Sequence, residues 1–158
     1  MINASSEFVR GGTLCLAKAG IKIGNGDTKD LDIAAPNGAG VDFAINGILY
    51  HKADAADIAI TAAAAQAALT SCLYLVTLNS SGTLATVKGT ERLTADITSG
   101  KYVLEWPAPA EDTCPIAAVR VDTDEGYTFT AGTTDFDAAG ITDTYYDLFA
   151  VPDAVITS

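Results

Sequence analysis

The stretch Val41–Ala53, which reads VDFAINGILYHKA, decides the fold class. Apolar and other residues alternate through its first half, with Val41, Phe43 and Ile45 on one side, and this period of two is typical of a half-buried strand. Asn46-Gly47 then provides the two residues with positive φ that a type I′ turn requires. The sequence therefore predicts a tight antiparallel hairpin.

The register of the hairpin follows from its two-residue loop, which places Phe43 opposite Tyr50. This aromatic pair would add a few tenths to about 1 kcal/mol across the strands. His51, the only histidine of the chain, lies opposite Asp42. Asp42 could orient an imidazole, but no Ser or Cys stands in an elbow such as G-x-S-x-G. A solvated or interface histidine is therefore predicted, rather than a catalytic base.

Further short strands recur downstream, with a turn signal every ~8–12 residues. Cys72–Leu78 (CLYLVTL) is a near-continuous apolar run and predicts a central strand covered on both faces. A turn at 79–82 leads from it into a partner strand at Thr83–Val87. Other strands are predicted at Ile58–Thr61, Tyr102–Trp106, Pro115–Asp122, Tyr127–Thr130 and Ile141–Leu148. This pattern predicts an all-β fold, a small antiparallel β-sandwich or barrel.

The alanine-rich segment Ala62–Leu69 (AAAAQAAL) is the best helix candidate in the chain, because Ala and Leu have high helix propensity. Eight residues are too few for a helix that is stable alone. The segment is expected to form either a short helix or a crossover turn or loop packed on the sheet.

Residues 1–40 differ from the remainder in being rich in Gly, Asn and Asp, with only short apolar stretches at Thr13–Ala17 and Ile21–Ile23. We expect this segment to be an extended N-terminal arm with short β segments that docks onto a partner. Residues 41–158 are expected to form the antiparallel β domain.

Charge excludes two classes of partner. The chain has 9 Lys and Arg against 20 Asp and Glu, for a net charge of −11. Nucleic acids need clustered basic residues, and so does an anionic membrane surface, so neither is an expected partner. No apolar segment approaches the ~20 residues of a membrane span. The first residues, MINASSEFVRGG, lack the pattern of a signal peptide, so folding in the cytoplasm is expected.

The three cysteines, Cys15, Cys72 and Cys114, form no close pair. An odd number without close spacing argues against a disulfide framework and against a zinc knuckle. Buried free thiols are therefore predicted.

Acidic side chains gather in two groups, Asp27, Asp30 and Asp32, and Asp122, Asp124 and Glu125. Neither group matches the sequence of a calcium-binding loop. The glycine-containing segment GNGDTK (24–29) matches neither a Walker loop nor a dinucleotide fingerprint. Solvated turns without a bound metal are predicted there.

Trp106, Tyr145 and Tyr146 could form a sugar-binding platform, although aromatic residues of small β domains are more often core or subunit interface. The chain is expected not to be an enzyme, and no catalytic, cofactor-binding or metal-binding residue is assigned.

Four segments in order also carry a resemblance to a known group of proteins. They are GVDFAINGILYHKADAADIAIT, SCLYLVTLNSSGTLATVKGTE, APAEDTCPIAAVRVDT and YTFTAGTTDFDAAGITDTYYDL. Together they cover roughly residues 40–150, and this order of turns and strands resembles head decoration, cement and head-fibre proteins of tailed bacteriophages.

The resemblance implies a structural virion protein without cofactor that decorates or cements the capsid surface and is assembled in the host cytoplasm. Its implied partners are the major capsid protein and further copies of itself, as a homotrimer. The alternative is a tail or fibre protein that contributes to host-surface attachment through glycans.

Overall fold

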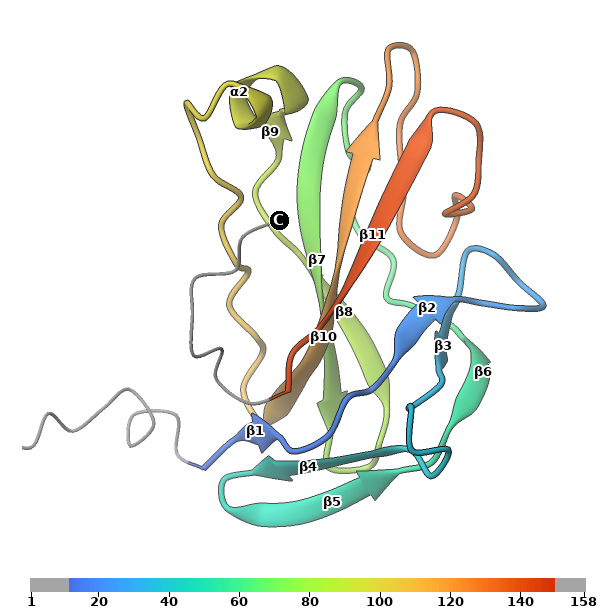
Figure 1. Cartoon of the computed structure of the whole chain (residues 1–158). Coiled ribbons are helices and arrows are strands. Elements are labelled where there is room, and N and C mark those ends of the chain that lie inside the picture. Colours follow the sequence, from blue (N-terminus) through green and yellow to red (C-terminus); the bar gives the residue numbers. More distant parts are fainter. Residues whose placement is uncertain (1–11, 150–158) are drawn as a thin grey trace, which may run out of the picture.

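The computed structural model describes residues 12–149, which are nearly all β (Figure 1). All strand pairings are antiparallel, which confirms the predicted fold class. The strands are β1 (Leu14–Cys15), β2 (Ile21–Ile23), β3 (Leu31–Ile33), β4 (Val41–Ile45), β5 (Ile48–Lys52), β6 (Ala55–Ile58), β7 (Thr70–Asn79), β8 (Leu84–Lys88), β9 (Arg92–Leu93), β10 (Thr113–Thr123) and β11 (Ile141–Asp147). The described residues also contain a short helix, α2 (Thr94–Thr98).

The strands form one long sheet and two small ones. The long sheet has the order β11-β10-β7-β8, with β9 added to the end of β7. The small sheets have the orders β1-β4-β5 and β2-β3-β6. In Figure 1 both small sheets lie below and to one side of the long sheet. The arrangement is sandwich-like, with the small sheets packed against the large one.

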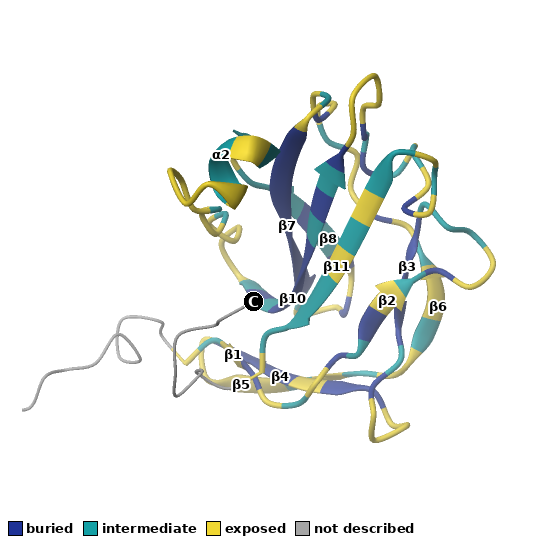
Figure 2. Cartoon of the chain, turned by 45° about the horizontal axis from the view of Figure 1, so that its top comes forward, coloured by how far each residue is buried: buried dark blue, intermediate teal, exposed yellow. Residues whose placement is uncertain are grey.

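β7 is the central strand that the apolar run predicted. Only its last residue, Asn79, is not buried (Figure 2). β10 pairs with one edge of β7 and β8 with the other. The turn after β7 is closed by the Asn79 side chain, which accepts hydrogen bonds from the backbone N–H groups of Ser81 and Thr83, both at 2.9 Å.

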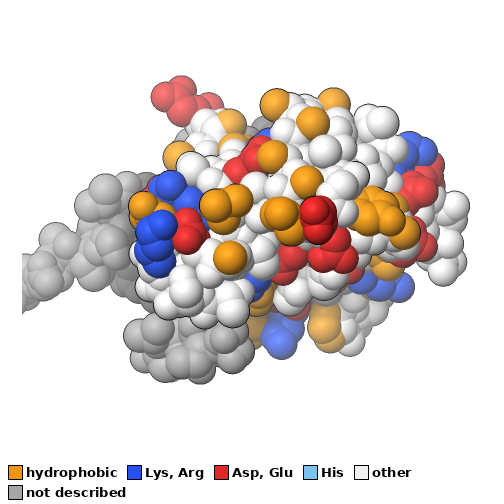
Figure 3. Space-filling model, turned by 90° about the horizontal axis from the view of Figure 1, so that it is seen from above, with side chains coloured by type: hydrophobic (Ala, Val, Ile, Leu, Met, Phe, Trp, Pro, Cys, Tyr) orange, Lys and Arg blue, Asp and Glu red, His pale blue; other side chains and the backbone are white. Residues whose placement is uncertain are grey.

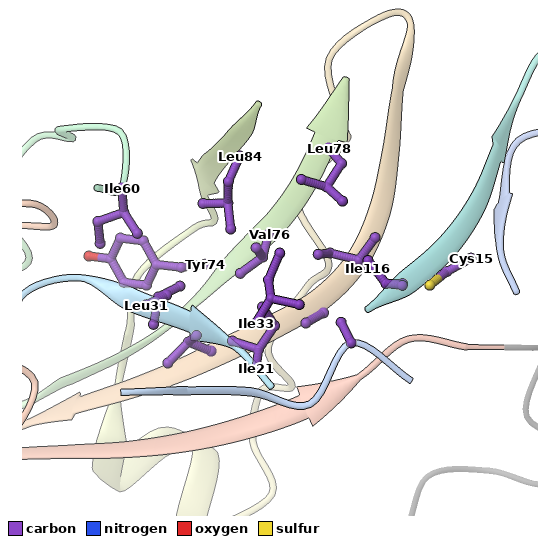
Figure 4. Packing of buried hydrophobic residues seen from close by; sticks show 14 of the residues in the cluster. Cys15, Ile21, Leu31, Ile33, Ile60, Tyr74, Val76, Leu78, Leu84 and Ile116 are labelled. Carbon is purple, nitrogen blue, oxygen red and sulfur yellow. The ribbon is translucent and has the colours of Figure 1, made fainter. Parts of the chain in front are cut away.

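The core lies between the long sheet and the small sheets. Leu31 and Ile33 of β3 pack toward Tyr74 and Val76 of β7 and toward Ile116 of β10 (Figure 4). A row of aromatic rings continues the core toward β11, with centroids 5.1–6.3 Å apart; it consists of Tyr74, Phe129, Phe136 and Tyr145. Both small sheets therefore share one hydrophobic core with the long sheet.

The predicted boundary at residue 40 does not separate an arm from a domain. Leu31 and Ile33 are 0% and 1% exposed, and β1 pairs with β4. The short apolar stretches sit among glycines and aspartates, but each supplies a strand whose side chains complete the core. Residues 12–40 are therefore part of the fold. The remainder of the predicted arm, residues 1–11, lies outside the described residues.

The segment 62–69 forms no helix and is a loop packed on the sheet, the other expectation for it. Gln66 makes an isolated bridge with Phe129, in which each backbone N–H donates to the other carbonyl at 2.7 and 3.2 Å. The Gln66 side chain is fully buried. Its tertiary hydrogen bonds outweigh the helix propensity of the alanine run, because a helix of eight residues has little stability of its own.

The strand predicted at 102–106 is wrong. That segment is irregular and exposed, with Val103 74% and Trp106 49% accessible. The side of β7 nearest to it in sequence is already paired with β8 and β9. Two other strand predictions are imprecise, because β6 ends at Ile58 and Phe129 forms only the bridge to Gln66.

Candidate functional site

The hairpin of β4 and β5 has the predicted geometry. Asn46 and Gly47 have φ angles of 52° and 80°, as a type I′ turn requires. Phe43 lies opposite Tyr50, and their rings stack with centroids 5.7 Å apart. Phe43 is fully buried on the core side, so the opposite side of the β1-β4-β5 sheet faces away from the core.

That opposite side, which we call the outer face, carries exposed leucines next to the exposed pair of Asp42 and His51. Its central row is Leu14, Ala44 and Leu49, which lie opposite one another across the three strands. Leu16 follows one step along, where its N–H donates to the Asp42 carbonyl at 2.9 Å. Leu14, Leu16 and Leu49 are 43%, 47% and 70% exposed. Ala44 between them is buried, so the three leucines alone supply the exposed apolar surface, which is of the kind that marks a protein interaction site.

The single histidine lies on the outer face, in the row next to Leu49 and Ala44. His51 Nδ1 lies 2.7 Å from Asp42 Oδ1, and both side chains are more than half exposed. An exposed pair of this kind contributes little to stability, so its place on the outer face is the more informative fact. The predicted solvated or interface histidine agrees with this position.

Asp27 and Asp32 of the first acidic group bind other groups of the protein. Asp32 accepts a hydrogen bond from the Asp57 N–H at 2.8 Å, and Lys22 Nζ lies 3.7 Å from the Asp32 carboxylate. Asp27 pairs with Lys29. In the second group, Asp122 accepts from Arg120 Nε at 3.0 Å. Across residues 12–149, no group of three His, Cys, Asp or Glu side chains is arranged to hold a metal ion.

The glycine loop at 24–29 is filled by a carboxylate that the sequence did not single out. Asp57 Oδ1 accepts hydrogen bonds from the N–H groups of Gly26 and Asp27 at 2.7 and 2.9 Å. Asp57 itself has a φ of 50°, at the end of β6. An anion would need those same two N–H donors. The loop is therefore a structural connection between β2, β3 and β6.

The three cysteines are free and buried, as predicted. Burial raises the pKa of Cys15 and of Cys72 to about 11, and that of Cys114 to about 12. The thiolate is the nucleophilic form, and it is scarce at neutral pH when the pKa is so high. These thiols act as small core side chains.

The three aromatic residues considered as a sugar platform are not gathered on one surface. Tyr145 and Tyr146 are neighbours on β11 and so point to opposite faces of the sheet. Tyr145 packs against Phe136, with ring centroids 6.3 Å apart. Trp106 lies in the irregular segment after α2 and is half exposed.

Apolar side chains are also exposed at the end of the long sheet that carries α2, including Leu93, Tyr102 and Val103. Figure 3 looks onto this end of the molecule, where hydrophobic side chains lie in small groups between acidic ones. Arg92 and Lys101 stack on the Tyr102 ring at 5.0 and 5.1 Å. The outer face differs because its leucines are adjacent across one regular sheet.

The sequence contains a pattern from which the leucines of the outer face could be found. Leu14 and Leu16 alternate around Cys15 in the same way as Val41, Phe43 and Ile45 alternate in the hairpin. Alternation alone does not say which side of a strand is buried. The pairing of β1 with β4 decides it, because Cys15 faces the core and both leucines face outward.

Comparison of the chain with protein-family models, with curated proteins and with solved structures finds no match. In the described part of the chain, no helix has the length and apolar character needed to cross a membrane.

Proposed function

We propose that this chain is a structural protein of a bacteriophage virion that decorates or cements the capsid. It acts by docking onto the assembled lattice of the major capsid protein, without catalysis. The observation that carries the proposal is the outer face, whose exposed leucines lie on a rigid sheet backed by the core. The resemblance of residues 40–150 to head decoration and cement proteins supplies the identity of the partner.

The physical logic of such a role is mass action. A protein that binds the assembled shell and not its dissociated subunits shifts the equilibrium toward the shell. Burying the three leucines would contribute at roughly 25 cal/mol for each Å² of apolar surface removed from water. Because the supporting sheet is regular and anchored by Phe43, little ordering entropy is lost on docking.

The first test is the number of copies in purified virions, measured by quantitative mass spectrometry against the major capsid protein. The proposal expects many copies, in a simple ratio to the capsid protein. A count of only a few copies per particle would contradict it, because a lattice protein repeats with the lattice.

The second test maps the surface used. Leu16→Lys places a charge on the outer face, and Val103→Lys places one at the α2 end as a matched control. Both positions are exposed, so neither change should alter folding by more than about 0.5 kcal/mol. Leu16→Lys should lose binding to capsids that lack the protein, whereas Val103→Lys should bind like the native chain. Equal binding of both variants would remove the outer face from the proposal.

A second candidate function is host-surface attachment through glycans, as part of a tail or fibre. The observation in its favour is the exposure of Trp106 and Tyr102, at 49% and 44%, in one irregular segment. Aromatic rings stack on sugars, so glycan-array binding that disappears in Trp106→Ala would favour this function. Normal adsorption of particles that lack the protein would count against it.

A further inference from the structure

The edges of the sheets differ in how far they are protected. A bare strand edge presents unpaired N–H and C=O groups and can pair with another chain, so proteins usually cover or interrupt such edges. The edge of β8 is covered by the segment that precedes β7: Thr86 N–H donates to Thr61 Oγ1 at 3.2 Å, and Thr86 Oγ1 donates to the Thr61 carbonyl at 3.1 Å. Lys88 Nζ donates to two further carbonyls of the same segment.

The edges of β11, β6, β1 and β9 are also protected, by a neighbouring strand, by a break in the strand or by shortness. β11 lies beside β2, where Asp147 accepts a hydrogen bond from the Gly20 N–H at 2.8 Å. β6 has four residues and is interrupted by the positive φ of Asp57. β1 and β9 have two residues each.

β5 is the exception. It is the last strand of the β1-β4-β5 sheet and pairs only with β4 among the described residues. Its five residues, ILYHK, contain no proline, and their register with β4 has no bulge. Ile48 and Leu49 are 59% and 70% exposed. In Figure 2, β5 runs along the outside of the molecule.

The hairpin register fixes which groups of β5 point outward. Ile45 and Ile48 flank the two-residue loop and form a hydrogen-bonded pair, and such pairs alternate along an antiparallel ladder. The Asp42 carbonyl bonds to Leu16 of β1, which agrees with this alternation. Leu49 and His51 therefore direct their N–H and C=O groups away from β4, toward the bare edge.

We propose that β5 is a pairing edge for β5 of a second copy of this chain, in an antiparallel dimer with its two-fold axis at Tyr50. About this axis all five residues overlap: Leu49 pairs with His51 of the other copy, and Ile48 lies opposite Lys52. The four outward N–H and C=O groups of each copy then find partners. The interface is isologous, so it closes at two copies.

Charge argues for a second copy as the occupant. Two molecules of net charge −11 repel each other, and they approach at least cost where acidic side chains are absent. β5 contains no carboxylate and carries His51 and Lys52. The nearest acidic residue on the outer face, Asp42, is paired with His51 of its own chain at 2.7 Å. Two acidic chains that pair through β5 therefore place no carboxylate on the two pairing strands.

This pairing does not depend on the proposed function and also differs from the trimer that the resemblance implies. It would place two outer faces side by side in one continuous sheet, with Leu49 of each copy near the junction. Two linked docking surfaces bind a lattice more tightly than either surface alone.

Sedimentation velocity of the full chain, from about 1 to about 300 µM, measures the assembly. The expected species at high concentration has twice the 16.2 kDa mass of the chain. Leu49→Lys puts an ammonium group opposite His51 of the other copy, and Leu49→Pro removes one outward N–H. Each should raise the dimer dissociation constant at least tenfold, while circular dichroism and the melting temperature at low concentration stay native.

Leu16→Lys is the matched control, because it adds the same charge to the same face but away from β5; it should dimerise like the native chain. A native chain that stays monomeric, a trimer, or a dimer that survives both Leu49 variants would overturn the pairing. Leu49 also belongs to the outer face, but sedimentation measures pairing in the absence of capsids and Leu16→Lys tests docking without touching β5. Failure of one proposal therefore leaves the other measurable.

Discussion

The most specific prediction for the stability of this protein concerns the buried side chain of Gln66. Its fully buried amide Nε2 donates to the carbonyls of Thr70 and Val121 at 3.0 and 2.9 Å. Its Oε1 accepts from the Tyr74 hydroxyl at 3.2 Å. The side chain therefore joins the connecting loop to β7 and β10, and it does so inside the core.

The cost of Gln66→Leu follows from these contacts. The Tyr74 hydroxyl loses its partner in a buried site, which costs about 1–3 kcal/mol, and two bonds to carbonyls are lost at about 1 kcal/mol each. The Thr70 carbonyl keeps a share of the Thr123 hydroxyl, which lies 3.2 Å from it and 2.7 Å from the Ala67 carbonyl, and leucine adds some apolar burial. We expect a net loss of about 3 kcal/mol in the free energy of unfolding.

Tyr74→Phe removes the other partner of the same bond and should cost about 1–2 kcal/mol, because the Gln66 Oε1 is then unsatisfied. In the double variant no hydroxyl is orphaned. Its loss should therefore fall short of the sum of the single losses by about 1 kcal/mol.

Urea unfolding followed by circular dichroism measures all three variants. With an m-value of about 2 kcal/mol/M, Gln66→Leu should lower the midpoint by about 1.5 M without changing m. Additive losses, within about 0.3 kcal/mol, would show that the amide and the hydroxyl do not depend on each other and would refute the reasoning.

Other predictions test the turn, the N-terminal strands, the thiols and a buried acid. Gly47→Ala should cost about 1 kcal/mol in urea unfolding, because φ is 80° there; an unchanged midpoint would contradict the type I′ turn. Leu31→Ala should lower the free energy of unfolding by about 2–5 kcal/mol. A loss below about 0.5 kcal/mol would show instead that residues 12–40 are an arm separate from the core. A thiol reagent at pH 8 should label Cys15 and Cys114 slowly until urea unfolds the chain, since burial raises their pKa to about 11 and about 12; fast labelling of the native protein would contradict their burial. Burial raises the pKa of Asp30, so the folded state favours its protonated form; this stabilisation is full below the unfolded pKa and is lost as pH rises through the folded pKa. Asp30→Asn should therefore raise the urea midpoint at pH 7 and have little effect where the native acid is already protonated, a difference that a pH series would reveal or refute.

Local patterns predicted the elements whose own residues specify them. The alternation of Val41, Phe43 and Ile45 and the turn residues Asn46-Gly47 were sufficient for the hairpin and its register, since a two-residue loop allows one pairing. The continuous apolar run identified β7 as a central strand for a similar reason, because a strand exposed on one face would alternate. Both predictions used only contacts between neighbours in sequence.

Elements that depend on distant partners were harder to predict. The apolar residues of Tyr102–Trp106 predict a strand, but both sides of the central strand β7 are already paired, with β10 on one and with β8 and β9 on the other. The alanine run at Ala62–Leu69 has helix propensity, but buried bonds from Gln66 to β7 and β10 hold it as a loop. In both cases the decisive groups lie far away along the chain, where local propensity contains no information.

The sequence by itself determined the all-β class, the tight hairpin, the central strand and the burial of the cysteines. Only the tertiary structure decided that residues 12–40 belong to the core, and that Leu14, Leu16 and Leu49 face outward together. A strand pattern states that two sides differ, but the side that is buried depends on what packs against it. The same reason makes β5 a bare edge: covering an edge is a property of the whole fold, not of the strand.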